Sequence, residues 1–156
     1  MQPLPLHKIT NLATEMENED KELHTVYLSL GSNIGNRKRA MSEAVELIGR
    51  MVGTVARQSS LIETEPWGFS SPNMFINCCV RVATTLAPRQ LLEATQAIEK
   101  QMGRTTKSTD GQYHDRVIDI DILLYDDLKV DQPDLKIPHP LMQERDFVMR
   151  PLREIL

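Results

Sequence analysis

The chain has 156 residues, of which 40% are hydrophobic and 26% charged, and its net charge is −4. This length and balance predict one globular domain with a sizeable core and leave little room for a second domain. The negative charge argues against a nucleic-acid binder, and no apolar run is long enough to span a membrane. The first residues also lack the pattern of a secretory signal, so we expect a cytoplasmic protein.

The first 24 residues differ in composition from the rest of the chain. They contain Pro3 and Pro5, followed by closely spaced acidic residues between Glu15 and Glu22. This composition predicts a poorly ordered extension over residues 1–24, before a domain over residues 25–156.

The domain is expected to begin with a strand over residues 26–30, a turn over residues 31–35 and a helix. Asn36 can cap that helix, and apolar residues recur with helical spacing from residue 41 to residue 51, before Gly53 ends it. The turn has neither the Gly-Lys-Ser/Thr ending of a P-loop nor the glycine spacing of a dinucleotide fingerprint. We therefore expect that ATP, if used, is not held by a Walker loop.

Two more strands are predicted, over residues 54–63 and 75–85, on either side of a loop rich in proline and glycine. Phe75 and Asn77 share one face of the second strand. This pair suits the edge of a heteroaromatic ring, because phenylalanine offers a stacking surface and an amide offers both donors and an acceptor. The adjacent Cys78–Cys79 pair is too close for usual disulfide geometry, so we expect reduced packing residues.

A second helix is predicted from Pro88 to Gly103, since proline suits a first helical turn and glycine a helix end. Its apolar stripe is formed by Leu91, Thr95, Ile98 and Met102. Leu92, Gln96 and Glu99 lie on another side, where polar residues are more often plain surface positions.

The polar segment over residues 104–116 contains three cations, Arg104, Lys107 and Arg116. Long segments of this kind are usually lids or disordered segments. Taken alone, the segment is more often a solvated basic loop. It is followed directly by two aspartates, and cations beside carboxylates at a metal site are what phosphoryl transfer requires.

Asp119 and Asp121 interrupt an apolar run over residues 117–125. In a strand both point to one face, while Ile118, Ile120, Ile122 and Leu124 line the other. A half-exposed strand with solvated aspartates is the plain alternative, but aspartate is depleted in strands. The spacing suits Mg²⁺ shared with a polyphosphate, because Mg²⁺ usually takes one or two carboxylates and leaves positions for phosphate oxygens.

The last part of the chain predicts a short hairpin near residues 128–130 and a helix after Pro140. With these additions the order strand, helix, strand, strand, helix, strand predicts an α+β ferredoxin-like βαββαβ sandwich with an extra C-terminal hairpin and helix. His139, Arg145 and Phe147 could contact phosphates or a nucleotide sugar, although a histidine between prolines can also be a packing or capping residue.

Five motifs in this order resemble the 6-hydroxymethyl-7,8-dihydropterin pyrophosphokinase family. They are L-S-L-G-S-N-I-G, E-T-E-P-W-G, F-I-N, R-V-I-D-I-D-I-L-L and P-H-P-L-M-Q-E-R-D-F-V-M-R-P-L. The resemblance covers residues 25–156 and implies Mg²⁺-dependent transfer of pyrophosphate from ATP to a pterin alcohol in folate biosynthesis. The expected attack is by the pterin hydroxymethyl oxygen on the β-phosphorus, with AMP leaving and ATP binding first.

The resemblance also implies roles for individual residues. Two magnesium ions would be held by Asp119 and Asp121, which with Arg104 and Arg116 form the expected catalytic group. The expected ATP contacts are Leu92, Gln96, Glu99, Lys107, Tyr113, Ile122, His139 and Arg145. The expected pterin contacts are Thr64, Glu65, Trp67, Phe75, Asn77 and Phe147.

The chain departs from the family pattern just before Arg116. His114-Asp115 stands where a glycine or alanine followed by a small residue or proline is common, and Thr106 stands where another arginine is often found. A family member without catalysis is therefore one alternative, and an RNA-binding or regulatory module of the same architecture is another. We expect a small-molecule enzyme that is a monomer or weak homodimer, although the sequence does not determine the oligomeric state, since no long exposed apolar seam stands out.

Overall fold

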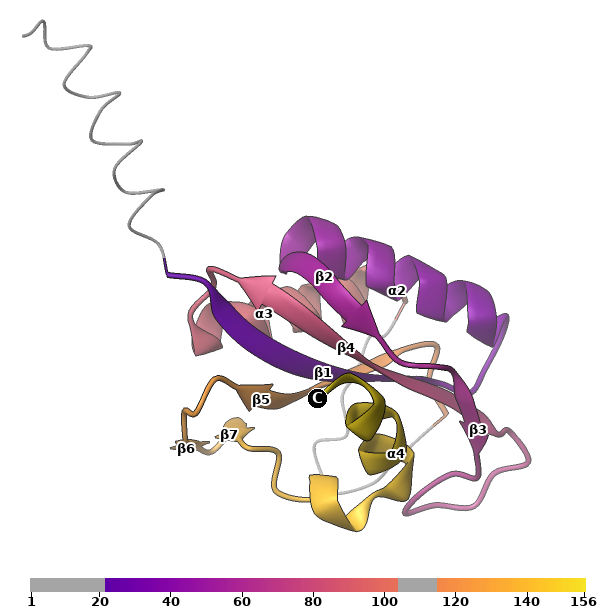
Figure 1. The fold of residues 1–156 in the computed structure, drawn as a ribbon. Helices are drawn as coiled ribbons and strands as arrows, with labels where there is room; N and C mark the ends of the chain where they lie inside the picture. The colour runs from indigo at the N-terminus through magenta and orange to yellow at the C-terminus, as the bar shows by residue number, and fades with distance from the viewer. Residues whose placement is uncertain (1–21, 104–114) are drawn as a thin grey trace, which may run out of the picture.

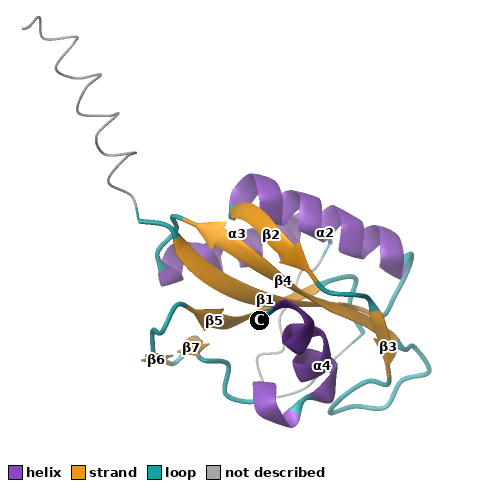
Figure 2. Cartoon of the chain, in the orientation of Figure 1, coloured by secondary structure: helices purple, strands orange, loops and turns teal. Residues whose placement is uncertain are grey.

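The computed structural model describes residues 22–103 and 115–156. Most of the predicted extension and most of the predicted basic segment lie outside these residues. Figure 1 and Figure 2 show the elements, which are β1 (His24–Ser32), α2 (Arg37–Met51), β2 (Gly53–Gln58), β3 (Ile62–Thr64), β4 (Phe75–Thr84), α3 (Pro88–Gln101), β5 (Asp119–Tyr125), β6 (Val130–Gln132), β7 (Leu135–Ile137), the 3-10 helix η1 (Met142–Glu144) and α4 (Asp146–Ile155). No described helix is long and apolar enough to cross a membrane.

The main sheet has the order β2-β4-β1-β5, and all of its neighbouring strands are antiparallel. β3 also pairs with β4, alongside the part of that strand that β2 does not reach. Helices α2 and α3 lie on one face of the sheet, and α4 lies on the other (Figure 1). The expected mixture of helices with an antiparallel sheet is therefore confirmed.

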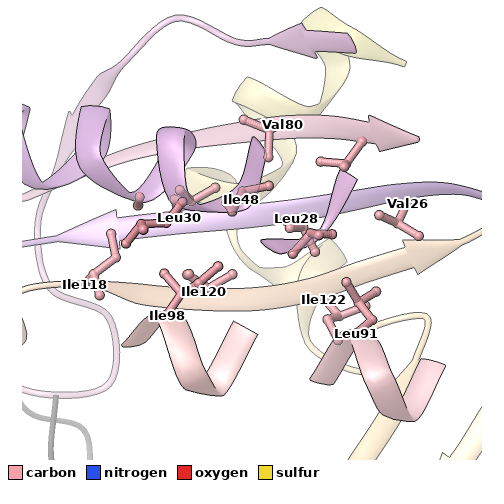
Figure 3. Close-up of a cluster of buried hydrophobic side chains, with 14 of the residues drawn as sticks. Val26, Leu28, Leu30, Ile48, Val80, Leu91, Ile98, Ile118, Ile120 and Ile122 are labelled. Carbon is pink, nitrogen blue, oxygen red and sulfur yellow. The ribbon is translucent and has the colours of Figure 1, made fainter. Parts of the chain in front are cut away.

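The larger core lies between the sheet and helices α2 and α3 (Figure 3). Alternate residues of β1, namely Val26, Leu28 and Leu30, are fully buried there. They meet Ile48 from α2 and Ile98 from α3. The alternation of β1 and most of the helical stripes therefore place apolar side chains as predicted, except that Met51 at the end of α2 is 37% exposed. The burial of this surface is the main force that holds the helices on the sheet.

The helix ends follow the predicted capping chemistry. The side chain of Asn36 accepts a hydrogen bond from the Arg39 amide at the start of α2. Pro88 occupies the first turn of α3, and Gly103 follows the helix with a φ of +101°. A left-handed conformation there costs little only for glycine, which explains why the helix ends at this point.

The predicted strand over residues 54–63 is wrong in one respect, because it is two strands. β2 ends at Gln58 and β3 begins at Ile62. Between them the hydroxyl of Ser59 accepts the amide hydrogen bond of Cys79 at 2.8 Å. A side-chain acceptor thus replaces a backbone acceptor in the ladder, and the strand is interrupted without leaving that amide unsatisfied.

A second correction concerns β5. The pairing with β1 shifts between Tyr27, opposite Leu124, and Leu28, opposite Ile122, so Leu123 is an extra residue on β5. A bulge reverses the alternation beyond it. Leu124 consequently packs with the smaller cluster around α4, whereas Ile118, Ile120 and Ile122 lie in the larger core as expected.

The C-terminal hairpin lies further along the chain than predicted. Its strands are β6 and β7, so residues 128 and 129 precede it. Burial explains the shift, because Leu135 and Ile137 in β7 pack into the larger core and fix which residues pair. The helix expected after Pro140 is present as α4, after the short η1.

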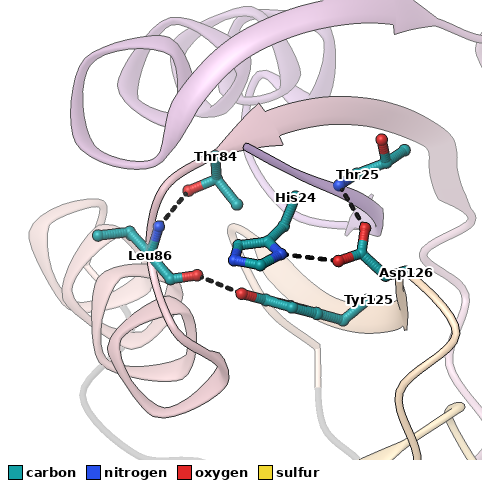
Figure 4. A network of polar contacts seen from close by, with 6 residues as sticks. All are labelled: His24, Thr25, Thr84, Leu86, Tyr125 and Asp126. Carbon is teal, nitrogen blue, oxygen red and sulfur yellow. Dashed lines mark hydrogen bonds and ion pairs between the residues drawn. The ribbon is translucent and has the colours of Figure 1, made fainter. Parts of the chain in front are cut away.

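The end of the sheet where β1 begins carries a polar network (Figure 4). The Asp126 carboxylate accepts from the Thr25 amide at 2.8 Å and contacts His24 Nδ1 at 2.7 Å. Tyr125 donates from its hydroxyl to the Leu86 carbonyl oxygen at 2.7 Å, beneath the His24 ring. The Asp126 contacts join the start of β1 to the residue after β5, and the Tyr125 hydrogen bond joins the end of β5 to the segment between β4 and α3.

Candidate active site

A cavity of about 760 Å³ opens where β1 ends and β5 begins. Its floor follows from strand register, because Gly31 of β1 is paired with Asn77 of β4 on one side and with Asp119 of β5 on the other. The cavity is lined by Ser29, Gly31, Thr64, Glu65, Trp67, Phe69, Phe75, Asn77, Arg116, Asp119, Asp121, Pro133, Lys136, His139, Pro140, Leu141, Arg145 and Phe147. Eleven of these were predicted site residues from four separate motifs, and the fold brings them together.

Gly31 permits close approach between the strands at the cavity floor. A Cβ atom at this position would lie 3.0 Å from Asn77 Oδ1 and 3.4 Å from Phe75 Cδ1. The distance to Asn77 is tighter than an ordinary contact, whereas the distance to Phe75 is an ordinary one, so a larger residue would press on the amide. The absence of a side chain at residue 31 thus leaves room for the Asn77 amide.

The two aspartates each lie near an arginine. Arg116 is 3.1 Å from Asp119 Oδ1, and Arg145 is 3.9 Å from Asp121 Oδ2. The arginine side chains are only 10% and 8% exposed, against 21% and 25% for the aspartates. Charges of both signs are thus held in a partly desolvated wall, where electrostatic interactions are stronger than in water.

Arg145 also contacts the aromatic residues of the cavity. Its guanidinium carbon lies 4.4 Å from the centre of the Trp67 ring and 5.7 Å from the centre of the Phe147 ring. Both separations fall within the range of cation–π attraction. The two rings therefore hold the guanidinium group beside Asp121. Trp67 and Phe147 come from parts of the sequence that are far from each other.

At the other end of the cavity the Asn77 side chain is 3% exposed and donates from Nδ2 to the Thr64 hydroxyl at 2.7 Å. The Phe75 ring lies against Phe69, with centres 6.2 Å apart in an edge-to-face arrangement. The hydrogen bond fixes the orientation of the amide, and the ring contact fixes the phenyl group.

His139 occupies the rim that joins the hairpin to η1. The Leu141 amide donates to its Nδ1 at 3.2 Å, so a neutral ring carries its proton on Nε2. The His139 amide donates to the Leu123 carbonyl oxygen at 3.0 Å and ties this rim to β5. His139 can therefore offer an N–H group to an anion in the cavity.

A smaller hollow of about 220 Å³ adjoins the cavity. It shares Asp121, Lys136 and His139 with the cavity, and it includes Leu92 and Ile122. Glu99 of α3 is buried and accepts the Ile120 amide at 3.1 Å, which anchors β5 to the helix. Gln96 is exposed and lines neither space.

Several lining residues were missed by the sequence prediction. Ser29 and Gly31 could have been found, since in L-S-L-G they alternate with the buried Leu28 and Leu30. Pro140 and Leu141 also could have been found, since they directly follow His139 in a quoted motif, whereas Phe69, Pro133 and Lys136 carried no local signal, because loop and hairpin packing brings them to the cavity. Of the predicted residues, Arg104, Lys107 and Tyr113 lie outside the described residues.

The donor set at β5 fits a magnesium ion shared with a ligand. Within residues 22–103 and 115–156, no group of three or more His, Cys, Asp or Glu side chains gathers. A cation bound to Asp119 and Asp121 would thus need further oxygen ligands. Mg²⁺ usually binds one or two carboxylates and completes its shell with phosphate oxygens and water.

The cavity combines paired carboxylates, two arginines of low exposure and an aromatic face with an oriented amide. These features are typical of small α+β enzymes that act on a phosphorylated ligand and an aromatic one. The family model described as 7,8-dihydro-6-hydroxymethylpterin-pyrophosphokinase (HPPK) matches residues 27–156. The chain belongs to this family. It is a pyrophosphokinase of folate synthesis, which confirms the predicted enzyme and argues against the RNA-binding or regulatory alternative.

Individual relatives agree with this assignment. A Porphyromonas gingivalis protein named 2-amino-4-hydroxy-6-hydroxymethyldihydropteridine pyrophosphokinase is 51% identical over 131 residues, which cover 83% of this chain and 89% of the relative. A Bacillus subtilis protein of the same name is 42% identical over 130 residues, covering 83% and 76%. The solved wild-type Plasmodium falciparum HPPK-DHPS with STZ-DHP has a TM-score of 0.63 at 17% identity, and supports the fold alone. That comparison covers 84% of this chain but only 39% of the other.

Proposed function

We propose that the cavity binds the pterin alcohol 6-hydroxymethyl-7,8-dihydropterin at its Asn77 end and the ATP triphosphate at its Asp119 end. The register Asn77–Gly31–Asp119 carries this proposal, because it puts an amide and a carboxylate on the two strands that flank β1, on one floor. The strand order β2-β4-β1-β5, with two helices on one face, further supports a ferredoxin-like arrangement.

The pterin ring would stack against Phe75 and Phe147, both of which line the cavity. Asn77 would hydrogen-bond the edge of the ring, with its amide held in one orientation by Thr64. Glu65 and Trp67 would form the rim of this half. Most of the binding energy would come from the apolar faces, and the specificity would come from the oriented amide.

The triphosphate would lie along the wall formed by Arg116, Arg145 and His139. Guanidinium groups can grip phosphate through two parallel N–H groups, and both arginines are already partly desolvated. Asp119 and Asp121 would hold two magnesium ions, which when bound supply positive charge that offsets the charge of the phosphates. The adjoining hollow beside Leu92 and Ile122 would take the nucleoside, with Glu99 and Gln96 nearby on α3.

In the proposed reaction, the hydroxymethyl oxygen of the pterin forms a bond to the β-phosphorus of ATP. The bond from the β-phosphorus to the oxygen that bridges it to the α-phosphorus breaks, and AMP leaves with that oxygen. The residues of this chain act mainly by holding the two substrates in line and by stabilising charge. Asp119 lies beside Arg116 and would be a weak base, so the hydroxyl proton is released to solvent water in this scheme rather than to a side chain.

We also place the enzyme in the cytoplasm as a monomer or weak homodimer that acts on small molecules rather than nucleic acid. Cys78 and Cys79 support a reducing compartment, because both are free and buried. Burial raises the pKa of each thiol to about 12, so neither is a reactive thiolate at neutral pH.

The proposal is tested by AMP formation from ATP with and without the pterin alcohol. The wild-type chain should form AMP only when the pterin is present, and D119N and D121N should each lower kcat by at least about 100-fold. The control D127N makes the same change at an exposed aspartate outside the cavity and should match the wild type. Near-normal turnover in both site variants would refute the metal assignment, and no turnover in a folded wild-type chain would favour a family member without catalysis.

A further inference from the structure

Asp115, which departs from the family pattern, lies in a hydrogen-bonded cluster next to the cavity. Its Oδ1 accepts from Asn33 Nδ2 at 2.7 Å, and its Oδ2 accepts from Asn73 Nδ2 at 2.9 Å. The Asn73 carbonyl oxygen accepts from Asn33 Nδ2 at 3.2 Å. One carboxylate thus joins the turn after β1 to the loop before β4, and we call Asn33, Asn73 and Asp115 the clasp.

The clasp also fixes the backbone of Arg116. Asn33 Oδ1 accepts the Arg116 amide at 2.7 Å, and the Asn33 amide donates to the Arg116 carbonyl oxygen at 3.1 Å. Asn33 is only 2% exposed, so these bonds are made in a largely desolvated place. The peptide groups on both sides of Arg116 are therefore held while its guanidinium reaches Asp119.

Asn73, at the other end of the clasp, lies just before the strand that carries the ring-binding half of the cavity. Asn73 is followed after one residue by Phe75, and Arg37 donates to the intervening Met74 carbonyl oxygen at 2.8 Å. The position of residue 115 is thus linked through Asn73 to the start of β4. A displacement of about 1 Å at a catalytic group can cost a large factor in rate.

We propose that Asp115 is a positioning residue for pyrophosphate transfer. By joining the side-chain amides of Asn33 and Asn73, it fixes the position of Arg116 relative to the ring-binding end of the cavity. This inference rests on the proposed role of Arg116 at the triphosphate. A carboxylate suits the position because it has two acceptor oxygens and no donor, matching two amide N–H groups. A proline at this position could make neither hydrogen bond.

The test uses kcat, the KM values of both substrates and the melting temperature of the full chain. D115A should lower kcat about three- to tenfold, with little change in KM for the pterin and a melting temperature well above the assay temperature. N73D places a second carboxylate against Asp115, and should lower kcat more than tenfold. D115N should be milder, because the Asn73 amide can turn to present its oxygen.

The double variant D115N/N73D exchanges donor and acceptor and restores both hydrogen bonds. It should recover kcat to within about threefold of the wild type, while D127N serves as the unrelated control. The inference would be overturned if adding D115N to N73D did not restore kcat. It would also be overturned if kcat of D115A were within twofold of the wild type. R116A separates the two proposals, since normal turnover in R116A would instead refute the proposed role of Arg116.

Discussion

At the scale of single residues, Gly31 contributes to the site because it has no side chain. Its neighbours across the sheet are Asn77 and Asp119, to which we assign the pterin end and the ATP end of the cavity in our proposal. The space above it is filled by the Asn77 amide and the Phe75 ring. The geometry of the ring-binding face therefore depends on a residue with no side chain.

We predict that G31A raises the KM for the pterin about tenfold or more, because the added methyl group would lie too close to Asn77 Oδ1 and displace the amide. The KM for ATP should change much less. G49A is the matched control, since a Cβ at Gly49 of α2 meets no atom within 4 Å. It should leave both KM values unchanged and slightly raise the melting temperature, as alanine favours helix. Equal KM values for the pterin in G31A and wild type would contradict this account of the floor.

At the scale of elements, β5 shows how far a sequence pattern can be followed. The alternation around Asp119 and Asp121 predicts their shared face, and both aspartates line the cavity. Beyond Ile122 the same alternation fails, because the bulge at Leu123 depends on pairing with β1. The break at Ser59 is similar, since it arises from a hydrogen bond to another strand. Local periodicity does not encode such contacts.

The far ends of β1 and β5 are joined by Asp126, which predicts a pH effect on stability. Partial burial raises the pKa of Asp126, but the Thr25 amide and His24 lower it by more, so the pKa lies below its ordinary value. Asp126 therefore stabilises the fold at pH values above the unfolded-state pKa of about 4, and this contribution is lost as the pH falls through the lower, folded-state pKa.

The measurement is the free energy of unfolding by urea from pH 7 to pH 3 for the wild type and D126N. Asparagine tolerates the positive φ of +46° at this position, so the variant removes the charge without adding backbone strain. Below about pH 5 the advantage of the wild type should shrink as the pH approaches 3. An advantage that grew between pH 5 and pH 3 would contradict the prediction.

At the scale of the whole molecule, four motifs far apart in the sequence supply one cavity. The sequence identifies residues such as Asn77, Asp119 and Arg145 because each stands in a recognisable pattern. It does not identify Lys136 or Phe69, whose positions follow from how the hairpin and the loop before β4 pack. The cavity is thus predictable where strands carry its residues, and less so where loops do.

The most direct test of the central claim is a crystal structure with Mg²⁺, a non-hydrolysable ATP analogue and the pterin alcohol. The account predicts a pterin ring between Phe75 and Phe147 with its edge on Asn77, and a triphosphate whose metal ions contact Asp119 and Asp121. The hydroxymethyl oxygen should face the β-phosphorus. A pterin bound outside this cavity, or a triphosphate away from β5, would contradict the account.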